Sequence, residues 1–117
     1  MSSFKDFEKI ADFLEEQSRT FPQSQRKIAL RRAISTIYYG VFWEVRERLR
    51  KRGYKIRERQ PHAHIIAKLK ELDSTVFQRM ERLKKFRELA DYQTDWKPNR
   101  KLYLFVKDLA NLILKGV

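Results

Sequence analysis

The segment from Ser24 to Gly53 restricts this chain to a fold built around one long helix. Its apolar residues recur every three or four positions, which places them on one face of an α-helix. They are Leu30, Ile34, Ile37, Val41, Val45 and Leu49. Ser24 is suited to cap the start of this helix, and Gly53 can adopt the left-handed conformation that ends helices. A helix of this length spans roughly 40 Å, about the width of a small domain. The other segments therefore have to pack along it.

Aromatic residues widen the apolar band of this helix, so we expect it to meet neighbours on two sides. Of the adjacent Tyr38 and Tyr39, one should face the core and the other its edge. Gly40 is unfavourable inside a helix, which predicts that another helix approaches closely there. Tyr39, Phe42 and Trp43 provide more aromatic surface than a core of this size readily hides. We therefore predict that these three residues form a homodimer or partner interface.

Four further helices follow from the same apolar spacing and from capping residues. The first covers Phe4–Ser18, and Pro61 suits the first position of a short helix that ends near Leu72. Asp73 or Ser74 can cap a fourth helix, and Asn99 a fifth. No segment alternates with the period of a strand. The sequence thus predicts an all-α protein: a single antiparallel, mostly up-and-down bundle of about five helices, with residues 1–117 in one domain.

Charge is the compositional feature that bears most on function. The 117 residues carry a formal net charge of +12 and include no Cys. The charge favours anionic partners such as nucleic acid, nucleotide or an acidic protein, although a basic surface can also serve solubility alone. The lack of Cys excludes disulfides and indicates the reducing cytoplasm. No run approaches the roughly 18 apolar residues of a membrane span, and the N-terminus does not resemble a signal peptide. The few Gly and Pro favour a thermophilic source.

Basic residues concentrate where the long helix ends. Between Arg46 and Arg59 there are eight basic residues and two acidic ones. The helix dipole accounts for cations in the last helical turn but not for those beyond it. This segment is therefore either an anion-binding site or a solvated face. The candidate anion contacts, called the basic cluster below, are Arg50, Lys51, Arg52, Lys55, Arg57 and Arg59.

Two blocks of sequence resemble the HEPN domains found beside prokaryotic nucleotidyltransferases. Residues 32–42, Arg-Ala-Ile-Ser-Thr-Ile-Tyr-Tyr-Gly-Val-Phe, resemble the second helix of these domains. Residues 86–92, Phe-Arg-Glu-Leu-Ala-Asp-Tyr, are similar to the Arg-Glu-x-Ala-Asp-Tyr block of one HEPN subgroup. His62 or His64 matches a His between these two helices. The resemblance implies a helical bundle that acts as an RNase, a toxin or a binding module, often in a toxin–antitoxin pair.

The resemblance also implies a metal-independent chemistry. HEPN RNases carry an Arg followed after four to six residues by a His; the His moves protons and the Arg holds the phosphate. Here Arg87 is followed after four residues by Tyr92, and a phenol is a poor base at neutral pH. The spacing recurs from Arg57 to His62 and from Arg59 to His64, outside the position of the family motif. The catalytic candidates are therefore Arg87, His62 and His64.

Our leading hypothesis is a HEPN-like accessory module without catalytic activity or cofactor. It would bind a nucleotide, RNA or a nucleotidyltransferase partner through the basic cluster and through Arg87, Asp91 and Tyr92. Asp91 lies four residues after Arg87 and can hold its guanidinium. The alternatives are a metal-independent endoribonuclease or toxin, and a structural helical interaction module. We expect no metal site, because the two His residues are two positions apart and do not share a helical face.

Overall fold

The structure is a computed structural model that describes residues 3–57 and 59–117. The described residues form five α-helices. The helices are α1 (Phe4–Ser18), α2 (Gln23–Lys51), α3 (Pro61–Leu72), α4 (Ser74–Tyr92) and α5 (Arg100–Gly116). No strand occurs in the described residues. The predicted all-α helical bundle is therefore confirmed.

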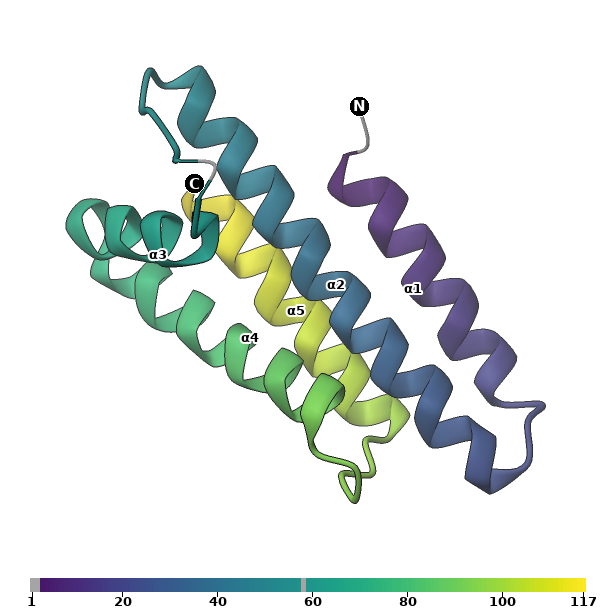
Figure 1. Cartoon of the computed structure of the whole chain (residues 1–117). Helices are drawn as coiled ribbons and strands as arrows, with labels where there is room; N and C mark the ends of the chain where they lie inside the picture. Colours follow the sequence, from purple (N-terminus) through teal and green to yellow (C-terminus); the bar gives the residue numbers. More distant parts are fainter. Residues whose placement is uncertain (1–2, 58) are drawn as a thin grey trace.

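The long helix α2 is the centre of the bundle. It contacts each of the other four helices, and the molecule measures 47 Å along its longest axis. In Figure 1, α1 and α4 run antiparallel to α2 on its two sides, whereas α5 runs in the same direction as α2. The short α3 lies across the beginning of α4 (Figure 1).

Local signals explain most helix ends. The Asp73 side chain accepts hydrogen bonds from the backbone N–H groups of Thr75 and Val76, and Asn99 accepts one from Leu102. Gly53 ends α2 with φ +93°, and the N–H of Tyr54 bonds back to the carbonyl of Leu49 in a Schellman motif. These three capping predictions are confirmed.

The predicted cap at Ser24 is wrong. The helix begins two residues earlier than a cap at Ser24 would place it, at Gln23, and Pro22 occupies the N-cap position. The Pro22 carbonyl accepts from the amides of Gln25 and Arg26 at 2.9 and 3.0 Å. Because Pro22 has no side-chain acceptor, the first turn of α2 lacks a side-chain cap.

Close packing of α1 on α2 accounts for Gly40. A Cβ at this position would lie 2.6 Å from the Cβ of Phe7 and 3.1 Å from Cδ1 of Phe4. The predicted close approach of a helix at Gly40 is therefore confirmed. On the inner side of α2, Tyr38 and Phe42 are fully buried, while Tyr39 lies half-buried at the edge of the core.

Polar side chains connect α1 to α5. Asp12 accepts hydrogen bonds from the Tyr103 hydroxyl at 2.7 Å and from the Lys107 ammonium at 2.8 Å. One turn further along α1, the buried Glu15 binds Arg100 at the start of α5. The tightly packed helix pair is thus α1 and α2. The buried face of α5 packs in the core against α2, and polar contacts join α5 to α1.

Candidate nucleic-acid interface

Arg87 lies on α4 at the centre of a group of aromatic rings. Its guanidinium carbon is 5.1 Å from the ring centroid of Tyr38, 6.0 Å from that of Tyr39 and 5.9 Å from that of Tyr92. Asp91, one turn along the helix, lies 3.7 Å from the guanidinium, as their spacing predicts. The side chain of Arg87 is only 12% exposed. Cation–π contacts and one carboxylate thus hold this guanidinium in place.

His62, at the start of α3, contacts Tyr38, one of the tyrosines beside Arg87. Its Nδ1 lies 2.9 Å from the hydroxyl of Tyr38. The imidazole stacks on Phe42 with 3.9 Å between the ring centroids. Arg87 and His62 come from segments 24 residues or more away from each other, and the structure brings both to Tyr38.

The surroundings of His62 keep it neutral at pH 7. Burial lowers the pKa of His62 below its usual 6.5, and the positive charges of Arg87 and Lys84 lower it further. Burial raises the pKa of Tyr38 to about 12, so its hydroxyl stays protonated. The neighbouring residues therefore fix the charge state of both side chains.

The charge of Arg87 also bears on which group donates the proton in the hydrogen bond between Tyr38 and His62. The guanidinium lies beside Tyr38, and its positive charge favours the arrangement in which the hydroxyl proton points away from Arg87. We therefore assign the O–H of Tyr38 as the donor to Nδ1 of His62. In a neutral imidazole the remaining proton then sits on Nε2. In this tautomer His62 offers a hydrogen-bond donor to a ligand, not a free base.

A groove between α2 and α4 adjoins this group. The groove has a volume of about 390 Å³. Its lining includes Arg31, Arg32, Tyr39 and Asp91. Arg31 donates to the carbonyl of Ala90 at 2.8 Å and so satisfies the C-terminal end of α4, whereas Arg32 is exposed. The groove therefore places one accessible cation close to the half-buried ring of Tyr39.

Tyr92 differs from the other tyrosines of this group because it faces solvent. It is 71% exposed, and its hydroxyl lies 3.5 Å from Nη1 of Arg87. It stands at the end of α4, where the helix gives way to the loop before α5. An exposed ring beside a fixed guanidinium is a combination that can take a base and a phosphate of the same nucleotide.

The basic cluster forms a second group. Arg50 and Lys51 end α2, and the other four residues lie in the segment between α2 and α3. All six are exposed, and within residues 3–57 and 59–117 none of them forms an ion pair. The segment they occupy leads directly into His62. The basic cluster is thus joined to the Arg87 group through the start of α3.

The remaining predicted site residues separate into different surroundings. His64 accepts a hydrogen bond at Nδ1 from the backbone N–H of Arg57 at 2.9 Å, which ties the loop to α3. Phe42 is only 1% exposed and stacks on His62, so it offers no surface to a partner. Trp43 is 43% exposed, with the guanidinium of Arg46 4.8 Å above its ring. Of the predicted interface, Tyr39 and Trp43 remain accessible.

Two residues of the site were not singled out as site residues from the sequence. Arg32 and Tyr38 both lie in the block of residues 32–42 that resembles HEPN domains. A signal for Tyr38 did exist, because a buried tyrosine hydroxyl needs a hydrogen-bond partner. No comparable signal pairs it with His62.

Comparison with models of known protein families, with curated proteins and with solved structures yields no match to this chain. The resemblance to HEPN domains therefore stays a prediction. Within the described residues, no group of three or more His, Asp and Glu side chains is placed to hold a metal ion. Of the helices described, none has both the length and the apolar character needed to cross a membrane.

Proposed function

We propose that this protein is a HEPN-like module that binds single-stranded RNA along the face formed by α2, the start of α3 and α4. The observation that supports this proposal is the fixed guanidinium of Arg87, which lies beside Tyr38, the hydrogen-bond partner of His62, and beside the exposed ring of Tyr92. In this arrangement a phosphate contacts Arg87 and a neighbouring base stacks on Tyr92.

Preorganisation favours Arg87 as the phosphate contact. A guanidinium presents a planar set of donors that matches two phosphate oxygens. Asp91 and the tyrosine rings already restrict its side chain, so little rotamer freedom is lost when a ligand binds. The N–H at Nε2 of His62 supplies a further donor to the same anion. Stacking on Tyr92 adds about 1–3 kcal/mol per base and tolerates any sequence.

The basic cluster extends this face along the RNA backbone. Its six exposed cations lie in the segment that leads to His62, and they supply the sequence-independent part of the affinity. The net charge of +12 agrees with a polyanionic ligand. We expect recognition by backbone contacts and stacking, without strong preference for one base.

Binding of a labelled single-stranded RNA, followed by fluorescence anisotropy, tests the proposal. Arg87→Ala removes one charge-assisted contact of about 1.5–3 kcal/mol and should weaken binding at least about tenfold. Arg82→Ala is the matched control, because Arg82 is an exposed cation on the same helix that packs on Phe105. The affinity of Arg82→Ala for the RNA should stay within about twofold of that of the wild type. Equal losses in the two folded variants would refute the role of Arg87.

A metal-independent endoribonuclease is the second candidate function. It is supported by one observation: Arg87 and His62 both contact Tyr38. In such an enzyme Arg87 would hold the phosphate while His62 moves a proton. The Nε2–H tautomer of His62 favours binding over base catalysis, so we expect the purified wild type not to cleave RNA.

A cleavage assay in the presence of a metal chelator separates the two candidates. RNA cleavage by the wild type that is lost in both Arg87→Ala and His62→Ala would establish the endoribonuclease. His64→Ala is the control, because His64 bonds the loop backbone at Arg57. Intact RNA together with measurable binding supports the binding module.

A further inference from the structure

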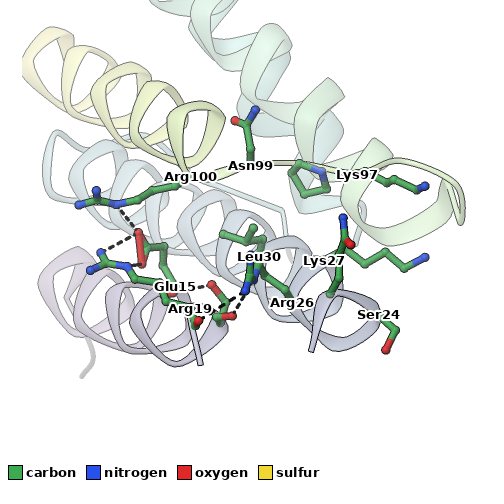
Figure 2. Close-up of a pocket in the computed structure, with 12 residues that line it drawn as sticks. Glu15, Arg19, Ser24, Arg26, Lys27, Leu30, Lys97, Asn99 and Arg100 are labelled. Atoms are coloured by element: carbon green, nitrogen blue, oxygen red, sulfur yellow. Dashed lines mark hydrogen bonds and ion pairs between the residues drawn. The ribbon is translucent and has the colours of Figure 1, made fainter. Parts of the chain in front are cut away.

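A basic cavity lies where α1 ends, α2 begins and α5 begins, and it shares no lining residue with the proposed RNA-binding face. It has a volume of about 690 Å³, within the range of small-molecule sites. Figure 2 shows the side chains that line it. They come from α1, from the first two turns of α2, and from the loop and first residue of α5. Two stretches that are distant in sequence, within residues 15–30 and 97–100, thus form one concave surface.

Positive charge dominates the lining. Five basic side chains face one carboxylate, that of Glu15. The basic residues are Arg19, Arg26, Lys27, Lys97 and Arg100. Such an excess of one sign in a concave site attracts anions and focuses their approach. The cavity therefore fits a ligand with several negative charges.

Glu15 fixes two of these cations without neutralising the site. It is 3% exposed and accepts two hydrogen bonds from Arg19, both at 2.9 Å. It accepts a third from Nε of Arg100 at 2.6 Å. One carboxylate thus offsets one charge while it holds two guanidiniums in position. The terminal nitrogens of Arg100 have no hydrogen-bond partner in the described part of the chain, and they remain available to a ligand.

The other three cations complete the lining. Arg26 donates from Nε to the carbonyl of Ser18 at 3.1 Å, so its guanidinium caps the end of α1. Lys27 and Lys97 form no ion pair with any described residue. In Figure 2, Arg19 and Arg100 converge on Glu15 on one side of the view, and Lys27 and Lys97 lie on the other. An anion between the two groups would meet donors from both.

The start of α2 adds to this field. The helix has no side-chain cap, because Pro22 stands at its N-cap position. Its first-turn N–H groups therefore carry the positive end of the helix dipole without a protein acceptor from a side chain. Gln23 and Ser24, which begin the helix, line the cavity. This contribution supplements the five side chains, which are the main source of the potential.

We propose that this cavity binds a compact polyphosphate, either as free inorganic triphosphate or as the triphosphate group of a nucleotide. The fixed guanidiniums of Arg19 and Arg100 can bind one phosphate group, while the flexible side chains of Lys27 and Lys97 bind the next. A single phosphate would engage only one of these groups and should bind more weakly. The site is separate from the RNA-binding face proposed above, and it does not depend on that function.

Isothermal titration of the full chain with sodium triphosphate at low salt tests the proposal. We expect one site per chain and an affinity that falls at least about tenfold in the double variant Lys27→Ala/Lys97→Ala. The matched control is Lys9→Ala/Lys115→Ala, which removes the same charge from exposed positions outside the cavity. The absence of triphosphate binding by the wild type would overturn the proposal. Equal losses in the two double variants would also overturn it.

A second variant shifts affinity in the opposite direction. Glu15→Gln keeps the side-chain shape but removes the only carboxylate of the lining, so triphosphate should bind at least about threefold more tightly. Damage to the fold would not produce tighter binding. If Glu15→Gln does not fold, the lysine variants still decide the outcome. Titration with a nucleoside triphosphate distinguishes the sources: higher affinity than triphosphate assigns the nucleotide, and equal affinity assigns the phosphate group alone.

Discussion

Replacing Gly40 by Ala tests whether the contact between α1 and α2 is as tight as the structure has it. In an ordinary helix interior this change stabilises by about 1 kcal/mol. Here the new Cβ would lie 2.6 Å from Cβ of Phe7, whereas carbon atoms in contact prefer about 3.5–4.0 Å. Cβ of Phe7 is bonded to the backbone and cannot rotate away, so α1 itself has to move by about 1 Å.

The two effects oppose each other, and their magnitudes decide the sign. Overpacking of this kind costs about 1–3 kcal/mol, which exceeds the gain in helix propensity. We expect Gly40→Ala to lower the free energy of unfolding by about 1 kcal/mol, with a fall in Tm of about 4 °C. Gly40→Val brings two further methyl groups and should cost about 2–3 kcal/mol. The free energy of unfolding should therefore decrease from the wild type to Gly40→Ala and again to Gly40→Val.

Urea denaturation gives these free energies, and amide hydrogen exchange locates the change. Gly40→Ala should reduce protection mainly in α1. The comparison variant is Gly53→Ala, because a Cβ there has no atom within 4 Å and the cost comes only from φ +93°. It should lower stability by about 1–2 kcal/mol without a selective effect on α1. A rise in stability for Gly40→Ala would refute the close approach of the two helices.

Three further predictions concern charge and assembly. Because the pKa of His62 is lowered in the folded protein, the unfolded chain binds more protons near and below pH 6.5. The free energy of unfolding should therefore fall as the pH is lowered from about 7 through 6.5. His62→Asn should reduce this fall, and identical pH profiles would contradict the assignment. Light scattering should give twice the chain mass of 14.3 kDa for the wild type and the mass of one chain for Trp43→Glu. A monomeric wild type, measured without a partner, would refute the dimer. The triple variant Lys51→Ala/Lys55→Ala/Arg57→Ala should flatten the salt dependence of RNA binding by about 2 log units per log unit of salt; an unchanged slope would place the RNA elsewhere.

Local sequence signals were sufficient for most of the fold. Apolar spacing and capping residues predict α1 and α3 with the bounds that the structure has, and Asp73 and Asn99 cap as predicted. The start of α2 was missed because Ser24 has the better side chain for capping. Pro22 sets the turn instead, since its fixed φ and its carbonyl suit the residue before a helix.

The sites depend on contacts that local patterns do not specify. Asp91 lies one turn from Arg87, so helical spacing is enough to predict their contact. His62 meets Tyr38 only because α3 folds back across the bundle, and no periodicity encodes that path. The triphosphate cavity joins three segments, and each contributes one or two cations that are unremarkable in a basic chain. Tertiary packing, and not composition, selects which charges meet.

The order of helix contacts has a consequence for how the chain folds. The tightest pair, α1 and α2, is consecutive in sequence, as are the packed pairs α3 with α4 and α4 with α5. The docking of α2 against α4 and α5, and the polar contacts between α1 and α5, require distant segments to meet. Low sequence separation between contacts goes with fast folding, in the microsecond to millisecond range for helical proteins. Because synthesis adds about 5–20 residues per second, the α1–α2 hairpin has time to form as it leaves the ribosome, and we expect the later helices to assemble on it.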